Sequence, residues 1–256
     1  GGCSAASGGY KRRFQKRFRV KDLGPLRQAL GASVSQDSGL GTICLSLEKY
    51  ITDLARRYNL LDNVAWADIP VPVAMEHECV KAVVSDAEAA ECSEVYGVLT
   101  GSVVFVASFA RPDVAFAAHF LSRFRCRPGR VHLKLAKRVL GYLSRTRALA
   151  LTYRKGTEDP ASFNFRPIDG KAPDRTGAPH LPVDTDHGVN RSVTGWLFMF
   201  AGAAVSWAVR GQLAPALSST EAELYGLSTG FCDMLTCIYV LEEMGMPSLS
   251  STLPRS

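Results

Sequence analysis

The sequence contains no run of 18 or more consecutive apolar residues, which excludes the simplest form of a membrane-spanning helix. It has no initiator methionine and no apolar signal core. It opens on GGCSAASGG, which predicts a flexible leader or the cut edge of something longer and gives no sign of secretion. Its seven cysteines are scattered and form no C-x-x-C pair, so we expect reduced thiols rather than a zinc site. The expected location is intracellular, cytoplasmic or nuclear.

The 256 residues, 46% of them hydrophobic, are enough for one large or two modest domains. The net charge of +6 is unevenly divided along the chain. Residues 1–155 carry 24 Lys and Arg against 13 Asp and Glu, whereas residues 156–256 carry 6 against 11. A basic first part suits a polyanion such as nucleic acid, although a basic surface also occurs for solubility alone.

The first part of the chain predicts a mixture of hairpin and helices. Two β-prone runs flank a turn at Asp37-Ser38-Gly39 and predict a hairpin over 29–47. Apolar periodicity predicts helices over 48–62 and 129–147, and two packed helices over 96–124 that join at Arg111-Pro112-Asp113. The acidic stretch 76–94 is expected to be a solvated loop. A short strand over 148–156 closes this part.

Residues 156–182 are rich in Pro, Gly and Asp and show no periodicity, so we place a linker there. The pattern beyond it predicts strands over 182–186, 192–201 and 204–209, followed by a long helix over 220–244. The expected layout is therefore a leader (1–13), a first region (14–155), a linker (156–182) and a second region (183–256).

The stretch ALSSTEAELYGL, residues 216–227, holds two glutamates at the start of the long helix. A Ser or Thr followed three residues later by Glu is a capping box, and both Ser218 with Glu221 and Thr220 with Glu223 fit it. The alternative is that one of the glutamates is a metal ligand. The spacing alone does not choose, because two residues span about 200° around a helix axis.

Four stretches of the chain, in order, resemble the polymerase polyprotein of copia-type LTR retrotransposons. They are FRVKDLGPLRQALGASVSQD, YGVLTGSVVFVASFARPDVAFAAHFLSRF, HLKLAKRVLGYLSRTRALALTY and RSVTGWLFMFAGAAVSWAVRGQLAPALSSTEAELYGLS. They are similar to the family segments "F-x-x-K-D-L-G", "T-R-P-D-I-A-F-A", "K-R-V-L-R-Y-L" and "A-L-S-S-T-E-A-E". The resemblance covers residues 14–246.

The resemblance implies a mixed α/β fold in two parts. Residues 14–155 are expected to form the palm-end, thumb and connection region of a reverse transcriptase. Residues 183–256 are expected to form an incomplete ribonuclease H-like domain of three antiparallel strands and one long helix. The parent activity would be RNA-directed DNA synthesis with cleavage of the RNA strand of an RNA–DNA hybrid.

The family pattern also implies which carboxylates descend from catalytic residues. It places Glu223 as a metal ligand and leaves Glu221 to capping. It places the first carboxylate at Asp184, although Asp186 lies on the same face of the expected strand and is an alternative. Here His187 stands where the family has Trp. Two Mg²⁺ ions would need three or four such oxygen ligands, and a third, in a "D-N-x-x-A" motif, is not found in this sequence.

No Asp-Asp pair occurs in the sequence, so the family's polymerase centre has no counterpart in it. With an incomplete carboxylate set, we expect the chain to be inactive by itself. The strand that would flank Val183–Asp186 in the family is also missing, which predicts an open sheet edge, marginal stability and possible self-association.

Two other functions compete with this expectation. One is a non-catalytic module that binds an RNA–DNA hybrid or another nucleic acid through the basic region; its phosphate contacts would be Lys134, Lys137, Arg138, Arg145 and Arg147, with no role for a membrane. The ordinary alternative for those residues is a solvated helix face. The other function is a residual nuclease, active in a dimer that shares carboxylates.

Overall fold

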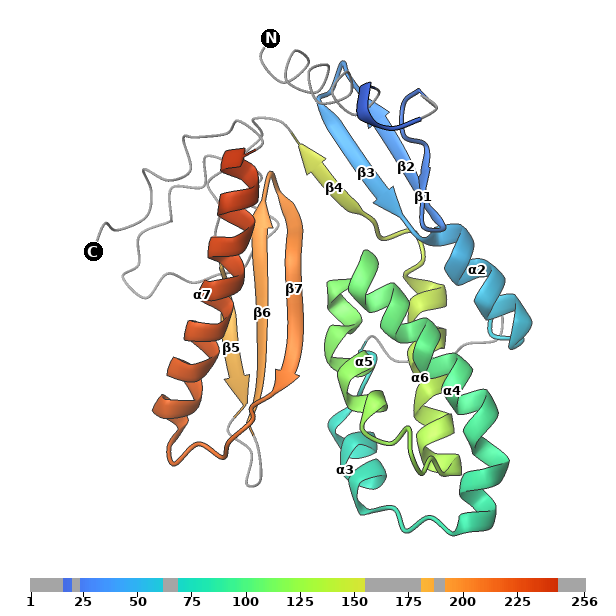
Figure 1. Cartoon of the computed structure of the whole chain (residues 1–256). Coiled ribbons are helices and arrows are strands. Elements are labelled where there is room, and N and C mark those ends of the chain that lie inside the picture. Colours follow the sequence, from blue (N-terminus) through green and yellow to red (C-terminus); the bar gives the residue numbers. More distant parts are fainter. Residues whose placement is uncertain (1–15, 20–23, 62–68, 155–180, 187–191, 244–256) are drawn as a thin grey trace.

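The computed structural model describes residues 16–19, 24–61, 69–154, 181–186 and 192–243. These residues form two antiparallel sheets and a group of helices (Figure 1). The leader 1–13 and nearly all of the linker 156–182 lie outside the described residues. The division into domains therefore stays a prediction.

The first sheet has the order β1-β2-β3-β4. Its strands are β1 (Gln28–Ala29), β2 (Ala32–Asp37), β3 (Thr42–Ser46) and β4 (Leu151–Arg154). The predicted hairpin is confirmed as β2 and β3. The carboxylate of Asp37 accepts hydrogen bonds from the backbone N–H groups of Gly39 and Leu40, which fixes the turn. The last strand, β4, arrives about a hundred residues later and pairs with β3.

Five helical segments follow β3. They are α2 (Glu48–Arg57), α3 (Val73–Lys81), α4 (Asp86–Phe109), α5 (Ala115–Ser122) and α6 (Arg130–Arg145), with a short 3₁₀ turn, η1 (Pro112–Val114), between α4 and α5. The two helices predicted to join at Pro112 are confirmed as α4 and α5. The amphipathic helix α6 is confirmed as well, and it packs against all four of the other helices.

The loop predicted for residues 76–94 is wrong. Residues 76–81 belong to α3, and residues 86–94 form the first turns of α4. The hydroxyl of Ser85 accepts a hydrogen bond from the backbone N–H of Glu88, which caps α4. Acids in a first turn are favourable, because they oppose the helix dipole. The acids of this stretch that follow Ser85 therefore indicate the start of a helix and not a loop.

Within the described residues, α4 is the single helix long and apolar enough to cross a membrane by length and composition. A core helix of a soluble protein passes the same test. Seven residues of α4 are buried against the rest of the fold, among them Tyr96, Leu99 and Val103. Packing inside the protein thus accounts for much of its apolar character.

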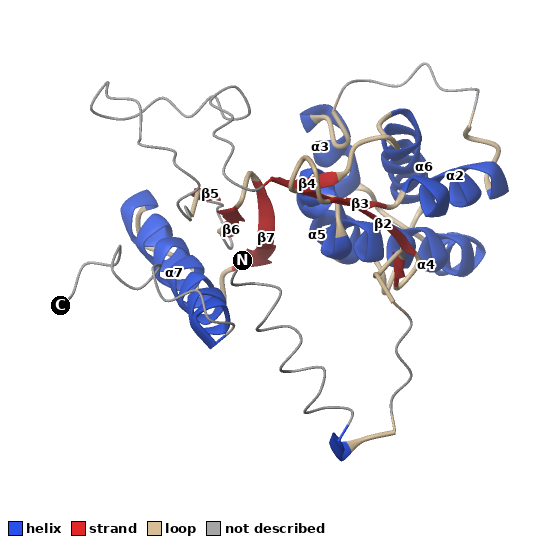
Figure 2. Cartoon of the chain, turned by 90° about the horizontal axis from the view of Figure 1, so that it is seen from above, coloured by secondary structure: helices blue, strands red, loops and turns tan. Residues whose placement is uncertain are grey.

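The second sheet has the order β5-β6-β7 and is covered on one side by α7 (Figure 2). The elements are β5 (Val183–Asp186), β6 (Val193–Phe200), β7 (Ala203–Gly211) and α7 (Ser219–Glu243). The predicted arrangement of three antiparallel strands and one long helix is confirmed, with every boundary within two residues. The fold is mixed α/β, as the family resemblance implied.

Two glycines let α7 lie close to the sheet. A Cβ on Gly226 would meet the hydroxyl of Thr185 and approach Thr194 to 2.7 Å. A Cβ on Gly230 would approach Val183 and Trp196 to 3.1 and 3.2 Å. Because Val183 and Thr185 face α7, alternation along the strand directs Asp184 and Asp186 to the other side of the sheet.

One hydrophobic core joins the helices to the other side of that sheet. It includes residues of α2, α4, α5 and α6 together with Met199, Ala203 and Ala204. The Trp207 indole donates a hydrogen bond to the backbone oxygen of Ala107 (2.6 Å), and the Tyr153 hydroxyl donates one to that of Ala204 (2.6 Å). A smaller cluster of Phe198, Met234 and Ile238 lies between the sheet and α7.

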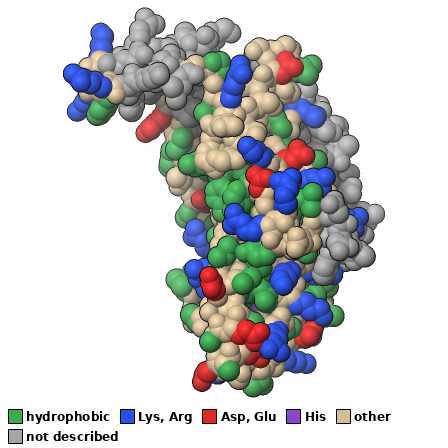
Figure 3. Space-filling model, turned by 90° about the vertical axis from the view of Figure 1, so that its right-hand side faces the viewer, with side chains coloured by type: hydrophobic (Ala, Val, Ile, Leu, Met, Phe, Trp, Pro, Cys, Tyr) green, Lys and Arg blue, Asp and Glu red, His purple; other side chains and the backbone are tan. Residues whose placement is uncertain are grey.

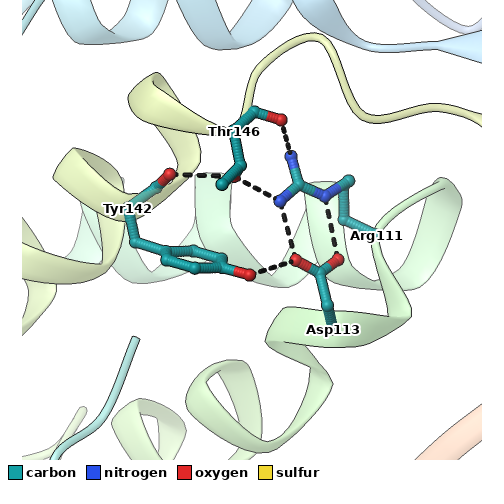
Figure 4. A network of polar contacts seen from close by, with 4 residues as sticks. All are labelled: Arg111, Asp113, Tyr142 and Thr146. Atoms are coloured by element: carbon teal, nitrogen blue, oxygen red, sulfur yellow. Dashed lines mark hydrogen bonds and ion pairs between the residues drawn. The ribbon is translucent and has the colours of Figure 1, made fainter. Parts of the chain in front are cut away.

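A buried arginine holds the junction of α4, η1 and α6 (Figure 4). Arg111 is 2% exposed and donates two parallel hydrogen bonds to the carboxylate of Asp113, at 2.8 and 2.7 Å. It also donates to the backbone oxygen and the hydroxyl of Thr146, at 2.9 and 2.6 Å. The Tyr142 hydroxyl donates to the same carboxylate (3.0 Å). The Arg111-Pro112-Asp113 turn therefore has a structural role, because it fixes the end of α4 against α6.

Candidate functional site: carboxylates of the second sheet and the basic helix

The two glutamates at the start of α7 have different surroundings. The backbone N–H of Glu221 donates to the Ser218 hydroxyl (3.1 Å), and the Glu221 carboxylate accepts from the backbone N–H of Leu217 (2.7 Å). Glu221 is therefore the capping residue, as the family pattern predicted. Glu223 is exposed and forms no hydrogen bond or ion pair within the described residues, so its carboxylate is available to a ligand.

A buried glutamine fixes the helix turn that carries Glu223. The side-chain amide of Gln212 donates to the backbone oxygen of Ala222 (2.7 Å) and to the Thr194 hydroxyl (3.0 Å). Its backbone N–H donates to the oxygen of Ser192 (2.8 Å). Ala222 immediately precedes Glu223, so Gln212 ties this part of α7 to β6.

Asp184 and Asp186 lie on β5, both exposed, on the side of the sheet opposite α7. The Asp184 carboxylate accepts a hydrogen bond from the backbone N–H of Thr185 (3.0 Å). This local bond occupies one of its oxygens. The structure places Asp184 and Glu223 on opposite sides of the β5 backbone, because Glu223 belongs to the helix above the other face.

These positions do not fit a two-metal centre. Within the described residues, no three side chains of the His, Cys, Asp or Glu type lie together in a group that could hold a metal ion. Two Mg²⁺ ions need three or four carboxylates converging on one point. We therefore derive no catalytic step through Mg²⁺ for these residues.

Asp233, on the middle of α7, has a structural role. Its carboxylate accepts hydrogen bonds from the Trp196 indole (3.1 Å) and the Ser206 hydroxyl (2.5 Å), and so links α7 to β6 and β7. Burial raises the pKa of the nearby Cys237 thiol, and the negative charge of Asp233 adds to that effect. The Asp233 carboxylate thus serves to hold α7 against the sheet.

The predicted phosphate contacts on and just after α6 differ in exposure. Lys134, Lys137 and Arg145 are exposed, whereas Arg138 and Arg147 are half-buried. One guanidinium nitrogen of Arg147 donates to the backbone oxygen of Ser144 (3.0 Å). Neither Lys134 nor Lys137 has an ion-pair partner among the described residues. These two lysines are therefore the best placed of the five to bind an anion.

The surroundings of the two lysines are only moderately basic. Arg130, one turn before Lys134, forms an ion pair with Glu91 (2.8 Å), and Arg127 forms one with Asp86 (2.8 Å). On the one face of the molecule that Figure 3 shows, Lys and Arg side chains are spread among apolar and acidic ones. Because Arg127 and Arg130 are paired with acids, Lys134 and Lys137 carry the charge that is left for an anion at this end of α6.

Sequence reasoning did not predict the hydrogen bonds through which Gln212 and Asp233 hold α7 against the sheet. Gln212 carried a signal, since the family segment that matches VSWAVRGQ ends in the same glutamine. The hydrogen-bond partners of Asp233 carried none, because Trp196 and Ser206 are 37 and 27 residues away along the chain. Only the packing of α7 on the sheet brings them together.

Comparison with known proteins places the chain among transposon proteins. It is 30% identical over 234 residues, 91% of its own length, to the retrovirus-related Pol polyprotein from transposon TNT 1-94 of Nicotiana tabacum, of which it spans 16%. It is 29% identical over 218 residues, 83% of its length, to a transposon Ty5-1 protein of Saccharomyces cerevisiae, of which it spans 63%. Half of the chain is 33% identical to secreted RxLR effector protein 161 of Plasmopara viticola, of which it spans 80%. No family model and no solved structure matches.

These likenesses and the fold define the class: the chain belongs to the retrovirus-related Pol polyproteins of transposons. Within that class it is of the copia type, as the four motif stretches indicated. It spans about one sixth of the length of the first Pol polyprotein to which it is similar, and 63% of the Ty5-1 protein.

Proposed function

We propose that the chain is the segment of a copia-type Pol polyprotein that connects reverse transcriptase to ribonuclease H. The parent activity would be RNA-directed DNA synthesis with cleavage of hybrid RNA. The 256 residues by themselves would not catalyse either step. The supporting observation is the placement of Asp184 and Glu223 on opposite sides of β5. Two carboxylates so placed are too few and too divided for two metal ions.

The test is an incubation of the purified chain with a labelled RNA–DNA hybrid, first in Mg²⁺ and then in Mn²⁺. The matched control is Glu223→Gln, which keeps the size and exposure of the side chain and removes its charge. We expect no cleavage by either protein while both remain folded by circular dichroism. Cleavage by the parent chain that is lost in Glu223→Gln would overturn the proposed inactivity.

The second candidate is a nucleic-acid-binding module, and it is favoured by Lys134 and Lys137, which are exposed and have no ion-pair partner in the part of the chain that the structure describes. Each phosphate contact contributes about 0.9 to the slope of log K against log salt on duplex DNA. Replacing both lysines by glutamine should therefore reduce the steepness of that slope by up to about 2 and weaken the binding of duplex DNA at low salt. Arg210→Gln is the control, because Arg210 is an exposed residue of β7 and not of α6, and its replacement removes one positive charge from another surface.

The outcome separates the two candidates. A slope that falls in the lysine variants and not in Arg210→Gln would establish a local binding site. Equal losses per positive charge removed in all variants would mean that net charge alone attracts nucleic acid, and the lysines would then be a solvated helix face.

A further inference from the structure

A buried histidine joins two helices of the first region. His132 is the third residue of α6 and is 2% exposed. Its Nδ1 atom accepts a hydrogen bond from the backbone N–H of Gly129 (2.8 Å), and its Nε2 atom lies 3.0 Å from the backbone oxygen of Cys79. Gly129 is the residue at which α6 begins, and Cys79 lies in the last turn of α3. The ring therefore contacts the start of one helix and the end of the other.

The two partners of the ring fix where it carries its proton. The Gly129 N–H is a donor, so Nδ1 must be unprotonated to accept from it. A neutral imidazole then has its proton on Nε2, which donates to the Cys79 oxygen. Each bond goes to a backbone group at a helix end, where the regular intrahelical partner is missing. His132 is thus a cap for both helices, and only its neutral form makes both bonds.

The ring is enclosed on its other sides. Phe124 stacks on it with the ring centroids 4.1 Å apart, and Tyr96 meets it edge-on at 6.4 Å. A Cβ on Gly129 would approach Val84 to 2.7 Å, so the chain beside the ring is already in close contact. Water therefore has little access to either ring nitrogen while α3 and α6 stay in place.

The charged groups at the start of α6 are engaged with one another. The Glu88 carboxylate, on α4, accepts from the backbone N–H of Arg130 (2.6 Å), and the Arg130 guanidinium forms an ion pair with Glu91 (2.8 Å). Arg127, just before α6, forms an ion pair with Asp86 (2.8 Å). These acids are therefore already bonded to cations or to a backbone N–H.

The titratable groups that α3 and α4 bring to the ring are neutral near pH 7. Burial, with a smaller effect of Glu78, raises the pKa of the Cys79 thiol to about 11. Burial also raises the pKa of the Tyr96 hydroxyl. Histidine is the side-chain type that ordinarily changes charge between pH 5 and pH 8. The helices α3, α4 and α6 carry two histidines, His132 and the exposed His77.

We propose that His132 is a proton-sensitive cap: uptake of one proton by its ring breaks the bond with Gly129 and opens the first turn of α6. A protonated Nδ1 is a donor and would face the N–H of Gly129, which is also a donor. The positive charge would also lie at the positive end of the α6 dipole. The bond from Nε2 to Cys79 survives, because both nitrogens of an imidazolium donate and a cation is favoured at a helix C-terminus.

The direction of the effect follows from proton binding. A ring exposed by opening takes up a proton near the ordinary imidazole value of about 6.5. Above that pH the opened and closed forms bind equally many protons on this ring, so the closed form is fully favoured. Below it the opened form binds one more, and the equilibrium constant for opening rises by at most about tenfold for each pH unit. Closure is therefore lost as pH falls.

The measurement is hydrogen exchange of the Gly129 amide in the full chain, expressed as a protection factor so that the intrinsic pH dependence of exchange is removed. We expect this factor to fall about tenfold from about pH 7 to about pH 5. The amide of Val103, in the buried middle of α4, should stay within about twofold. A Gly129 protection factor that does not change with pH, or an equal fall at Val103, would overturn the proposal.

His132→Gln is the matched variant. A glutamine at the third helical position also accepts a hydrogen bond from the N–H at the helix start, and it takes up no proton in this range. Its Gly129 protection factor should stay within about twofold between the two pH values. His119→Gln is the control, because burial, with a smaller effect of Arg123, lowers the pKa of this second partly buried histidine. A fall of parent size in His132→Gln, or its loss in His119→Gln, would assign the effect to another group and refute the cap.

The ring itself gives a measurement that needs no folded variant. Nitrogen NMR of the parent chain should show His132 with its proton on Nε2 at about pH 7 and with both nitrogens protonated at about pH 5. The second proton should appear over the same pH range as the loss of Gly129 protection. A proton on Nδ1 at neutral pH, or full protonation with no change at Gly129, would contradict the proposed switch.

Discussion

Replacing Asp113 by asparagine should destabilise the fold strongly, because it leaves the Arg111 charge buried without its counter-ion. Arg111 is 2% exposed, and two of its hydrogen bonds go to the Asp113 carboxylate. Removing one partner of a buried ion pair costs about 3–5 kcal/mol. The Asp113 side chain is 33% exposed, so water can partly replace it. We therefore expect a loss of about 2–3 kcal/mol of unfolding free energy.

The assay is equilibrium unfolding in urea followed by tryptophan fluorescence. Tyr142→Phe is the control, since it removes one hydrogen bond to the same carboxylate and keeps the ion pair; it should cost about 1 kcal/mol. The double variant Arg111→Met with Asp113→Asn should be less destabilised than Asp113→Asn alone, because no buried charge remains. If Asp113→Asn lies within about 0.5 kcal/mol of the parent chain, the network does not lock this junction.

Three further predictions concern packing and pH. Gly226→Ala should destabilise the fold by about 1–3 kcal/mol through overlap with Thr185, as measured by urea unfolding, whereas Gly101→Ala, whose Cβ would meet nothing within 4 Å, should stabilise α4 by up to about 1 kcal/mol. Asp233→Ala should cost about 2 kcal/mol and alter tryptophan fluorescence, because Trp196 loses its acceptor; an unchanged spectrum and midpoint would contradict this role. Burial, with a smaller effect of Glu78, raises the pKa of the Cys79 thiol from 9.0 to about 11, so its stabilising contribution is complete below about pH 9 and is lost as pH rises toward 11. In reducing buffer, the free energy of unfolding of Cys79→Ala should therefore fall less steeply between pH 9 and pH 11 than that of the parent chain. Equal slopes for the two proteins would show that ionisation of the Cys79 thiol does not cause the loss.

The second sheet and α7 were predictable from the sequence because their signals are local. Alternation defined β6 and β7, and the Ser-Ser-Thr-Glu run marked the start of α7. The acidic stretch 76–94 was mispredicted because its acids were interpreted from their charge alone. Their place directly after a capping serine was not considered. Ser85 followed by Glu88 three residues later is itself a capping signal.

The candidate site was predictable only in part. Which glutamate caps α7 followed from the family pattern, and the hydrogen bonds of Glu221 agree with it. The side of the sheet that Asp184 faces depended on the register of β5 against α7, which Gly226 and Gly230 decide through close packing. The partial burial of Arg138 depended on α6 being surrounded by four helices, and one-dimensional periodicity does not show how many neighbours a helix has.

The core that the helices share with β6 and β7 has a consequence for how the polypeptide could be divided. Met199, Ala203 and Ala204 lie in the same apolar cluster as Leu135 and Val139, and the Trp207–Ala107 bond reinforces that contact. We therefore expect the two regions to associate without the covalent link through residues 155–180. Two separately produced polypeptides, one ending near residue 155 and the other starting near 181, should recombine into one folded particle and unfold as one unit.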